Sequence, residues 1–482
     1  MAEKKPFYIT TTLPYVNAAP HVGFALEMVQ ADIIARYHDL IGDEVFFNTG
    51  TDEHGLKIHR KAIEEGKHPQ EYVDGYAEKF RGLKDKLNLY PDLHFVRTTD
   101  VHHKKAAQEF WTLCFNNGDI YKKNYKVKYC VGCELEKTDS ELVDGKCPIH
   151  PNLEIEIIEE ENYFFRLSKY QQPLLDFYKS RPDFVVPDFR FNEIKKFVEA
   201  GLEDFSISRL TEKMPWGVPV PNDPEQIMYV WFDALVNYIS TVGWPEDIEK
   251  FERFWGTKEH PNGLQFAGKD QIRQQAAMWQ AMLLSANLPS TKQIIIHGFI
   301  TSGGQKMSKS LGNVIDPYEV VAEYGTDALR YFLARHIHPF EDSDFTMERF
   351  KEAYNADLAN GLGNLVARIM QLAQSHLEKG TRPEPEGFPA EYTEALEKFE
   401  INRVLEFVWS RIQLLDQQIT DTEPFKVIKN NPEEGKEIIL ALTQELYLIG
   451  RMLNPFMPET NAKIKQAIIE NKKPENLFVR KD

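Results

Sequence analysis

The sequence is poor in cysteine and has no long apolar run. Only four cysteines occur in 482 residues, and Cys130, Cys133 and Cys147 lie close together, unlike the cysteines of a secreted disulfide framework. No apolar stretch approaches the roughly 18 residues of a membrane-spanning helix. The first residues, MAEKKPFYITTTLPY, contain no apolar region before a cleavage site. These absences argue against a disulfide scaffold and a membrane protein, and predict a cytoplasmic protein in a reducing compartment.

The chain also lacks an excess of basic residues. Its formal net charge is -17, with 57 Lys and Arg against 74 Asp and Glu. Proteins that bind nucleic acid without specificity are usually basic, so the balance argues against that class. It leaves open a nucleic-acid substrate held by a local patch. A hydrophobic content of 42% and a length of 482 residues predict a soluble protein of two to four domains.

The order of apolar patterns predicts an α/β fold interrupted by an insertion. A β-prone run at 7–12 is followed by a helical pattern that ends at Gly42 and by the strand-like segment EVFFNTG. Strand, glycine turn, helix and strand are typical of a doubly wound, Rossmann-like parallel sheet. The alternation of strand-like and helical segments is lost after Cys114 and returns in EQIMYVWFDALVNYI and KQIIIHGFI. We therefore expect a split parallel-sheet domain with an inserted segment.

From about residue 350 the pattern is helical, which predicts an all-α bundle. The expected helices span 351–377, 391–418 and 436–452, with the linker GTRPEPEGFP between the first two. The resulting division of the chain has five segments, namely 1–114, 115–212, 213–315, 316–350 and 351–482.

Two glycine-containing loops have the composition of phosphate-binding segments. PHVGF at 20–24 lies between the first strand and the first helix, where a helix N-terminus offers unpaired N–H groups and Gly23 permits close approach. GGQKMSKSLGN at 303–313 places Lys306 and Lys309 between glycines, so both lysines can swing toward an anion. Taken singly, the first fits a tight turn with an incidental histidine and the second fits a solvated basic loop.

Together, however, the two loops in a split α/β chain resemble those of the class I aminoacyl-tRNA synthetases, in which both loops bind ATP. Six segments in order resemble the methionyl members of that family over nearly the whole chain: TLPYVNAAPHVG, GTDEHG, SISR, YVWFDALVNY, FAGKD and HGFITSGGQKMSKSLGN. The resemblance implies that the split sheet is the catalytic domain, that 316–350 links it to the bundle, and that 351–482 binds the anticodon.

The resemblance also implies the residues of the active site. His21, Lys306 and Lys309 would be catalytic. The residues matching the ATP site are Pro20, His21, Gly23, Phe24, Gly268, Asp270, His297, Gly298, Lys306, Met307 and Lys309. The residues matching the methionine site are Thr12, Leu13, Tyr15, Asp52, Arg209, Trp231, Ala234, Tyr238, Gln271 and Gln275. Without the family resemblance, ordinary core packing would be the favoured interpretation of the aromatic residues Tyr15, Trp231 and Tyr238. Arg209 would be interpreted as part of a surface ion pair.

Two positions depart from the family pattern. Phe24 replaces the second histidine of the usual HxGH turn, so ATP binding must depend more on backbone N–H groups and lysines. Gln275 stands where a histidine commonly lines the methionine pocket. Because glutamine can both donate and accept a hydrogen bond, the pocket can still operate.

The cysteine cluster has the spacing of a zinc knuckle. Cys130-x2-Cys133 and Cys147-x2-His150 form two short pairs separated by a loop, as in tetrahedral Cys3His sites for Zn²⁺. Four protein ligands leave no open position, so the zinc is expected to be structural. Free thiols near a chance histidine are the alternative. Cys114 is left over and is expected to be a small buried hydrophobe.

One face of a predicted helix in the bundle is polar. Asn360, Asn364 and Arg368 recur every four residues, and the resemblance implies that they read unstacked anticodon bases by hydrogen bonds. Phe425 stands where the family usually has a tryptophan that stacks on the first anticodon base. A solvated polar face and a packing residue at a helix start are the respective alternatives.

The resemblance predicts ATP-dependent attachment of methionine to its tRNA through a methionyl-adenylate. The partners would be methionine, ATP with Mg²⁺, and tRNA, and we expect a monomer. The insertion is too short for the editing domain of the isoleucyl, valyl and leucyl enzymes. A small-molecule nucleotidyltransferase and a non-catalytic tRNA-binding paralogue remain alternatives.

Overall fold

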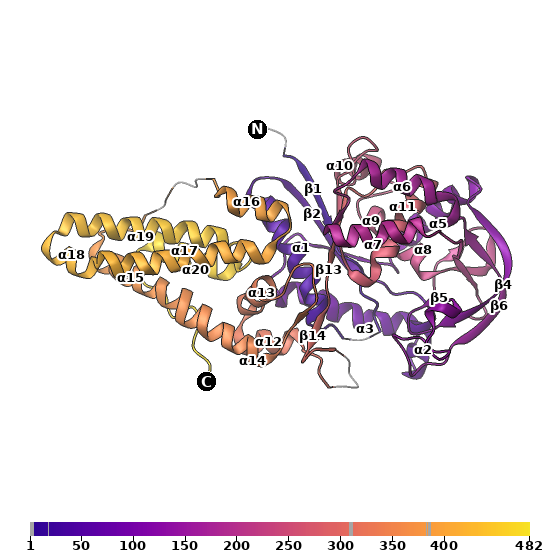
Figure 1. Cartoon of the computed structure of the whole chain (residues 1–482), viewed down its shortest axis with the longest axis horizontal. Coiled ribbons are helices and arrows are strands. Elements are labelled where there is room, and N and C mark those ends of the chain that lie inside the picture. Colours follow the sequence, from indigo (N-terminus) through magenta and orange to yellow (C-terminus); the bar gives the residue numbers. More distant parts are fainter. Residues whose placement is uncertain (1–3, 18, 308–311, 382, 384–386) are drawn as a thin grey trace. The chain divides into compact units, whose positions relative to one another are not determined.

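The computed structural model describes residues 4–17, 19–307, 312–381, 383 and 387–482 (Figure 1). The chain forms two compact units that are not simple halves of the sequence. Unit 1 comprises Met1–Ala19, Glu44–Gly82 and Asp92–Ile296, and unit 2 comprises Pro20–Asp43, Leu83–Pro91 and His297–Asp482. The chain therefore passes from one unit to the other several times.

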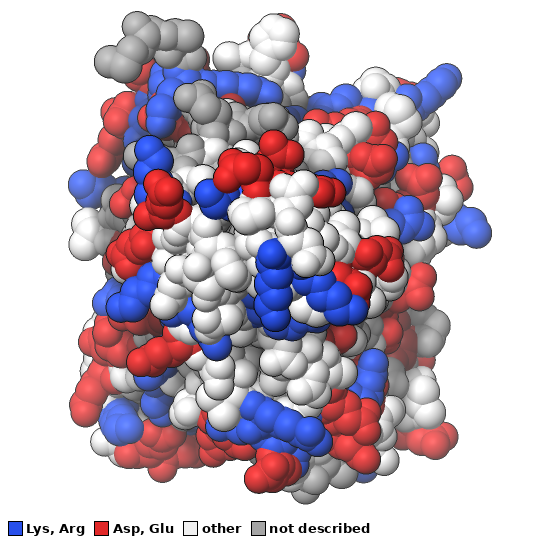
Figure 2. All heavy atoms as spheres, turned by 90° about the vertical axis from the view of Figure 1, so that its left-hand side faces the viewer, with Lys and Arg blue, Asp and Glu red and all other residues white. Residues whose placement is uncertain are grey.

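The surface carries charges of both signs. Figure 2 shows the end of the molecule that bears α18 (Pro424–Asn430), where basic and acidic side chains are intermingled around uncharged surface. Recognition of an anion on this face therefore depends on local groups rather than on a broad basic field. None of the helices in the described part of the chain has the length and apolar character needed to cross a bilayer.

The core of unit 1 is a six-stranded sheet in the order β3-β2-β1-β12-β13-β7. Its strands are β1 (Pro6–Thr10), β2 (Glu44–Thr51), β3 (His94–Arg97), β7 (Val185–Val186), β12 (Gly263–Gly268) and β13 (Gln293–His297). β1 pairs in parallel with β2 on one side and with β12 on the other, with Tyr8 opposite both Phe46 and Gly263. β-Branched and aromatic residues favour these strands. The pairing of β1 with β12 confirms the split parallel sheet.

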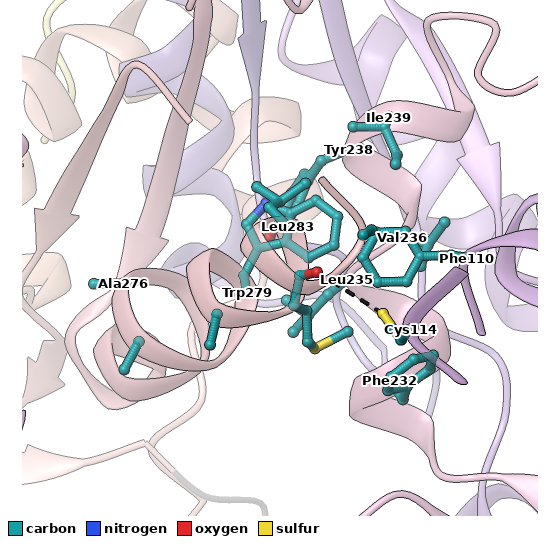
Figure 3. Packing of buried hydrophobic residues seen from close by; sticks show 14 of the residues in the cluster. Phe110, Cys114, Phe232, Leu235, Val236, Tyr238, Ile239, Ala276, Trp279 and Leu283 are labelled. Atoms are coloured by element: carbon teal, nitrogen blue, oxygen red, sulfur yellow. Dashed lines mark hydrogen bonds between the residues drawn. The ribbon is translucent and has the colours of Figure 1, made fainter. Parts of the chain in front are cut away.

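Short helices bury a large apolar cluster beside this sheet (Figure 3). They are α5 (Val101–Asn116), α8 (Val230–Ala234), α9 (Asn237–Ser240) and α11 (Trp279–Ser285), the last preceded by a π-helical turn at Gln274–Met278. Cys114 is fully buried there, and its Sγ lies 3.9 Å from the carbonyl oxygen of Met282. Burial raises the pKa of its thiol to about 12, so Cys114 is the small buried hydrophobe that we expected.

The insertion that interrupts the α/β pattern is built on a long antiparallel ladder. β4 (Ile120–Cys130) pairs with β6 (Glu156–Phe165), from Ile120 opposite Phe165 to Tyr129 opposite Glu156. β5 (Leu135–Lys137) and β8 (Phe205–Ser206) complete this sheet. The adjacent lysines of β4 and glutamates of β6 interrupt the alternation of apolar and polar residues that indicates a strand. The sequence pattern therefore did not reveal these two strands.

Several shorter elements connect these parts of unit 1. The helices are α2 (Leu56–Glu64), α3 (Pro69–Arg81), α6 (Gln171–Ser180), α7 (Asp188–Glu199) and α10 (Ile248–Phe254). A three-stranded sheet consists of β9 (Ser208–Leu210), β10 (Pro219–Val220) and β11 (Asp223–Met228). The parallel bridge between Tyr15 and Asp52 extends the pairing of the segments after β1 and β2.

A fully buried arginine joins distant segments of unit 2. Arg330, on α13 (Thr326–Arg335), donates to the Asp32 carboxylate of α1 (Val22–Leu40) at 2.6 Å. The same guanidinium also donates to the backbone carbonyl oxygens of Leu87, Pro455 and Phe456. Since a buried charge is stable only when paired and hydrogen-bonded, this arginine holds the N-terminal helix against the C-terminal part of the chain.

The remainder of unit 2 is a small sheet and the expected helical bundle. The sheet contains β14 (Ile300–Ser302), β15 (Gln305–Lys306) and β16 (Ser343–Asp344). The helices are α4 (Leu83–Lys86), α12 (Pro317–Tyr324), α14 (Met347–Ala353), α15 (Asn364–His376), α16 (Ala390–Glu397), α17 (Ile401–Thr422), α18, α19 (Pro432–Leu453) and α20 (Pro458–Glu470). The prediction of one helix over 391–418 was wrong, because Phe399 adopts a left-handed conformation with a φ of 59° and separates α16 from α17.

Candidate functional site

The turn that contains His21 begins α1. His21 occupies the N-cap position, and its Nδ1 accepts a hydrogen bond from the backbone N–H of Gly23 at 3.0 Å. Burial lowers the pKa of His21 to about 4, with a further contribution from the charge of Lys306. The ring is therefore neutral near pH 7. Because Nδ1 accepts, Nε2 carries the hydrogen and can donate it to a phosphate oxygen.

Phe24, in place of the second histidine, packs beside His21 with ring centroids 4.6 Å apart. A Cβ at Gly23 would lie 2.7 Å from the His21 ring, so a side chain there would displace that ring. Val22 donates its backbone N–H to the carbonyl oxygen of Ile315, which follows the lysine-rich loop. The turn and this loop are thus attached to each other within unit 2.

The lysine-rich loop is built on glycines that no other residue replaces easily. Gly303, Gly304 and Gly312 all have positive φ angles, of 63°, 71° and 64°. The backbone N–H of Gly304 donates to Asp344 at 2.9 Å, which anchors one side of the loop. Lys306 is exposed and Met307 is half-buried, whereas Lys309 lies outside the described residues.

His297 lies at the end of β13 and contacts α1. Its Nε2 lies 2.8 Å from Oε2 of Glu27, and its Nδ1 lies 2.7 Å from the carbonyl oxygen of Gly298. Both contacts place an oxygen acceptor beside a ring nitrogen of His297. A Cβ at Gly298 would lie 2.2 Å from the backbone of Glu341, so only glycine fits there.

Asp52 is a buried carboxylate in unit 1. Its backbone N–H donates to the carbonyl oxygen of Pro14 at 3.0 Å, and its own carbonyl oxygen accepts from Val16 at 3.2 Å. Its Oδ1 has no hydrogen-bond partner among the residues that the structure describes. Burial raises the pKa of Asp52 well above its usual value, and the charges of Asp233 and Glu134 raise it further. A cationic ligand would relieve this unfavourable burial.

An aromatic group surrounds Arg209. Its guanidinium lies 4.5 Å from the ring centroid of Tyr229 and 5.4 Å from that of Tyr129. Tyr15 and Trp231 pack against the same cluster. A buried guanidinium held by aromatic faces can bind a substrate carboxylate or phosphate in a dry environment. Arg209 is therefore not the surface ion pair that was the alternative.

Tyr238 and Gln275 form the polar part of a second buried group. Gln275 donates from Nε2 to the Tyr238 hydroxyl oxygen at 2.7 Å, and its own Oε1 accepts from Gln265 at 3.4 Å. Gln275 therefore both donates and accepts, as we expected of a residue that replaces a histidine. Its orientation is fixed, because Thr291 donates to the Gln265 oxygen at 2.7 Å and leaves the Gln265 amide as a donor.

The remaining sequence-predicted residues are distributed over both units. In unit 1, Thr12, Leu13 and Gln271 are half-buried, Ala234 and Gly268 are buried, and Asp270 is exposed. In unit 2, Pro20 is buried. The residues predicted to bind methionine thus lie in unit 1, whereas the His21 turn, His297 and Lys306 belong to unit 2.

Sequence reasoning missed a buried histidine–aspartate group. Asp233 accepts from Nδ1 of His54 at 2.8 Å and from Nε2 of His103 at 2.9 Å. Burial alone raises the pKa of Asp233, but the charges and hydrogen bonds of the two histidines outweigh burial and bring it to about 2. His54 and Asp233 lie inside the GTDEHG and YVWFDALVNY segments, which was the available signal. The charged Asp233 acts on the pKa of Asp52.

The four predicted zinc ligands converge. The ligand atoms of Cys130, Cys133, Cys147 and His150 all lie within 4.8 Å of one another. Sγ of Cys133 lies 3.4 Å from Sγ of Cys147 and 3.2 Å from Nδ1 of His150. A tetrahedral zinc with Zn–S bonds of about 2.3 Å requires ligand separations of about 3.8 Å, so the donor set fits this metal. Such a cluster can hold a metal ion.

A cavity of about 700 Å³ lies on the bundle. Asn360, Asn364, Arg368 and Phe425 all line it, together with Asp416, which forms an ion pair with Arg368. Asn360 lies in a π-helical segment, Tyr354–Gly363, so the four-residue spacing is not strictly α-helical. The side chains nevertheless reach one cavity. The cavity is also lined by residues that no sequence motif indicated, namely Gln371, Gln413, Gln417 and Lys473.

Comparisons with known proteins agree with this geometry. The family model described as tRNA synthetases class I (M) matches residues 7–155 and 141–370. A methionine–tRNA ligase from Thermotoga maritima is 42% identical over 97% of this chain and 76% of its own length. A methionine–tRNA ligase from Nostoc sp. is also 42% identical, over 96% of this chain and 90% of its own length.

Solved structures show the same fold. Mycobacterium tuberculosis methionyl-tRNA synthetase in complex with methionyl-adenylate superposes with a TM-score of 0.89 at 34% identity, covering 99% of this chain and 100% of that one. The apo form of the Mycobacterium tuberculosis enzyme gives a TM-score of 0.83 at 31% identity, covering 100% of this chain and 99% of that one.

Proposed function

The chain belongs to the methionine–tRNA ligase family of class I tRNA synthetases, and from this premise we propose that it activates methionine with ATP and transfers it to tRNA. The observation that carries the proposal is the full-length likeness to an enzyme solved with methionyl-adenylate. The substrate carboxylate attacks the α-phosphate of ATP, and pyrophosphate leaves. A hydroxyl group of the terminal adenosine of tRNA then takes the methionyl group.

The amino-acid site would lie in unit 1. Asp52 supplies a buried carboxylate for the substrate ammonium group, and Arg209 faces the substrate carboxylate or the phosphates. The polarizable thioether of methionine packs well against aromatic rings such as Tyr15 and Trp231. Tyr238, whose hydroxyl oxygen accepts from Gln275, would form part of the wall of this pocket. Leu13, Thr12, Ala234 and Gln271 would complete this pocket.

The ATP site would use the two loops of unit 2. Neutral His21 donates from Nε2 to a phosphate oxygen, and the N-terminal N–H groups of α1 add partial positive charge. Lys306 and Lys309 neutralise the charge that develops on the departing pyrophosphate. Mg²⁺ would arrive with ATP as part of the substrate. Since the substrate carboxylate is already ionised, adenylate formation needs no general base, and catalysis is positioning plus charge stabilisation.

We infer that the Cys130, Cys133, Cys147 and His150 cluster holds a structural Zn²⁺. Four protein donors leave no position for a reacting group, so the metal would contribute folding energy to the insertion. A Cβ at Gly132 would lie 2.5 Å from the His150 ring, which shows how closely the knuckle wraps its ligands.

The bundle would read the anticodon. Asn360, Asn364 and Arg368 supply hydrogen-bonding groups along one wall of the cavity, and exposed Phe425 offers a face for base stacking. The cavity contains several amides and one ion pair, which suits recognition of base edges better than recognition of a uniform anion. A monomeric, cytoplasmic enzyme remains our prediction for the assembly and the compartment.

Amino-acid-dependent exchange of pyrophosphate into ATP tests the proposed function. With a panel of amino acids, exchange should occur with methionine and be at least tenfold weaker with leucine, isoleucine and valine. Exchange that needs no amino acid would indicate a small-molecule nucleotidyltransferase. Binding of tRNA without any exchange would indicate a non-catalytic paralogue.

A further inference from the structure

The residue after the second cysteine of the knuckle does not face solvent. Glu134 directly follows Cys133, yet it is only 5% exposed. Its φ of 49° lies in the left-handed region, which non-glycine residues rarely adopt. Such a conformation is strained and persists only when the surroundings impose it. The backbone turn therefore directs this carboxylate inward.

The inward-facing carboxylate reaches the segment that follows β1. Oε1 of Glu134 accepts from the Tyr15 hydroxyl at 2.7 Å and from the backbone N–H of Lys57 at 2.8 Å. Both hydrogen bonds thus use one oxygen. Oε2 is buried and has no hydrogen-bond partner in the part of the chain that the structure describes. A buried carboxylate oxygen without a donor is costly unless a ligand supplies one.

Gly55 keeps the space beside this oxygen clear. A Cβ on Gly55 would lie 2.3 Å from the Tyr15 hydroxyl oxygen and 2.7 Å from Oε2 of Glu134. Its φ of 114° also favours glycine. Any side chain at this position would therefore displace either Tyr15 or Glu134.

Asp52 provides a second oxygen of the same kind. Its Oδ1 is also buried without a described hydrogen-bond partner, and Asp52 is bridged to Tyr15 through the backbone. Lys57 donates its Nζ to the carbonyl oxygen of Gly132 at 3.3 Å and forms no hydrogen bond with either of these two oxygens. Glu134 contacts Tyr15 through its hydroxyl group and Asp52 through the backbone bridge, and each of these buried acidic side chains has one oxygen without a described donor.

We propose that Glu134 is a second acidic residue for the α-ammonium group of the amino-acid substrate, acting together with Asp52. An ammonium group has three N–H donors, enough to serve Oε2 of Glu134, Oδ1 of Asp52 and one further acceptor. The knuckle would then contribute directly to the amino-acid site in addition to folding the insertion. This inference rests on the proposed function and names an element of substrate recognition within it.

The test compares methionine with an analogue that has a hydroxyl in place of the ammonium group, 2-hydroxy-4-(methylthio)butanoate. The variant is Glu134→Gln, whose amide oxygen can still accept from Tyr15 and Lys57 but carries no charge. Calorimetry should show that the variant binds methionine about 10- to 100-fold more weakly, the scale of losing one hydrogen bond to a charged group. Binding of the hydroxy analogue should change less than threefold.

The matched control is Glu156→Gln, which removes the same charge from an exposed ion pair with Arg60 in the same insertion. It should leave the affinity for both ligands unchanged. Zinc content and melting temperature are measured for each variant, so that a disturbed knuckle is recognised. Glu134→Asp provides a second variant, in which a retained charge should restore part of the preference for methionine over the analogue.

Two results would overturn the inference. Equal weakening of methionine and the hydroxy analogue by Glu134→Gln would mean that Glu134 only holds Tyr15 in place. Unchanged affinity for both would mean that the carboxylate plays no part in binding. Failure of the proposed function is a separate outcome, because the wild-type protein would then show no methionine-dependent exchange.

Discussion

Nδ1 of His21 accepts a hydrogen bond from the backbone N–H of Gly23, 3.0 Å away, so the ring that begins α1 has only Nε2 available as a donor. One side chain thereby performs two tasks. It caps the helix with one nitrogen and keeps a hydrogen on the other, which we propose it donates to a phosphate group of ATP.

Substitution of His21 by asparagine or alanine should separate these tasks. Asparagine is a good N-cap but does not reach as far, whereas alanine provides neither function. Both variants should slow methionine-dependent exchange by about 10²-fold, the scale of losing one preorganised donor. Only His21→Ala should lose about 1 kcal/mol of stability in urea unfolding. Near-normal exchange by His21→Asn would show that Nε2 is not used.

The low pKa of His21 predicts how stability changes with pH. The unfolded chain binds a proton at His21 below about 6.5, whereas the folded chain does so only below about 4. Between these values the unfolded state holds more protons, so this residue destabilises the folded state as pH falls from about 6.5 to 4. Urea unfolding at several pH values should therefore show a steeper loss for wild type than for His21→Asn. Parallel curves would contradict the low pKa.

Lys309 should act mainly in the transition state. Lys309→Ala should slow adenylate formation by about 10²-fold or more and leave the affinity for methionine almost unchanged. Pre-steady-state measurements separate the two quantities. Lys463→Ala, on the exposed face of α20, serves as the control. A Lys309→Ala variant with a near wild-type rate would remove this residue from the catalytic site.

The knuckle should contain one Zn²⁺ per chain. Cys147→Ser should lose the metal and make residues 130–150 sensitive to protease, because metal binding there supplies folding energy. Cys114→Ala is the control, since this buried thiol lies in the apolar cluster and should leave the zinc content unchanged. Elemental analysis of protein purified without chelators measures both. Absence of zinc from the wild-type protein would refute the assignment.

Arg368 should matter for tRNA charging but not for adenylate formation. Arg368→Ala should leave pyrophosphate exchange close to normal and reduce charging sharply, through lost contacts to bases or phosphate. Arg403→Ala removes an exposed arginine that pairs with Glu400, the residue just before α17, and should affect neither reaction. A parallel fall of exchange and charging for Arg368→Ala would indicate a folding defect instead.

Phe425 should follow the same pattern if it stacks on a base, at a cost of roughly 1–3 kcal/mol in tRNA binding. If it is a packing residue, Phe425→Ala should instead lower the melting temperature and spare charging by the folded fraction. Its exposed fraction of 45% favours stacking.

The parallel sheet and the knuckle could be predicted because their signals are local. The run from Phe7 and the strand EVFFNTG have strand-forming residues, and two short Cys/His spacings indicate a cluster that can hold a metal ion. The break at Phe399 could not be predicted, because a left-handed phenylalanine depends on tertiary packing.

The candidate amino-acid site was predicted only in part. Asp52 and Tyr15 lie in recognisable segments, but Glu134 has no periodic or motif signal of its own. Its position depends on a backbone turn and on the closeness of Gly55, which only the folded chain reveals. The partnership of Asp233 with His54 and His103 is likewise a property of the packed core.

The ion pair between Arg330 and Asp32 has a consequence for folding during synthesis on the ribosome. The two residues are 298 positions apart, and both are fully buried in the finished protein. At about 5–20 residues per second, synthesis takes about 15–60 s to deliver the arginine after the aspartate. Throughout that interval α1 cannot complete its native surroundings, because its buried Asp32 lacks this partner until residue 330 has been made. Chains truncated before residue 330 should therefore accumulate as chaperone-bound or insoluble fragments.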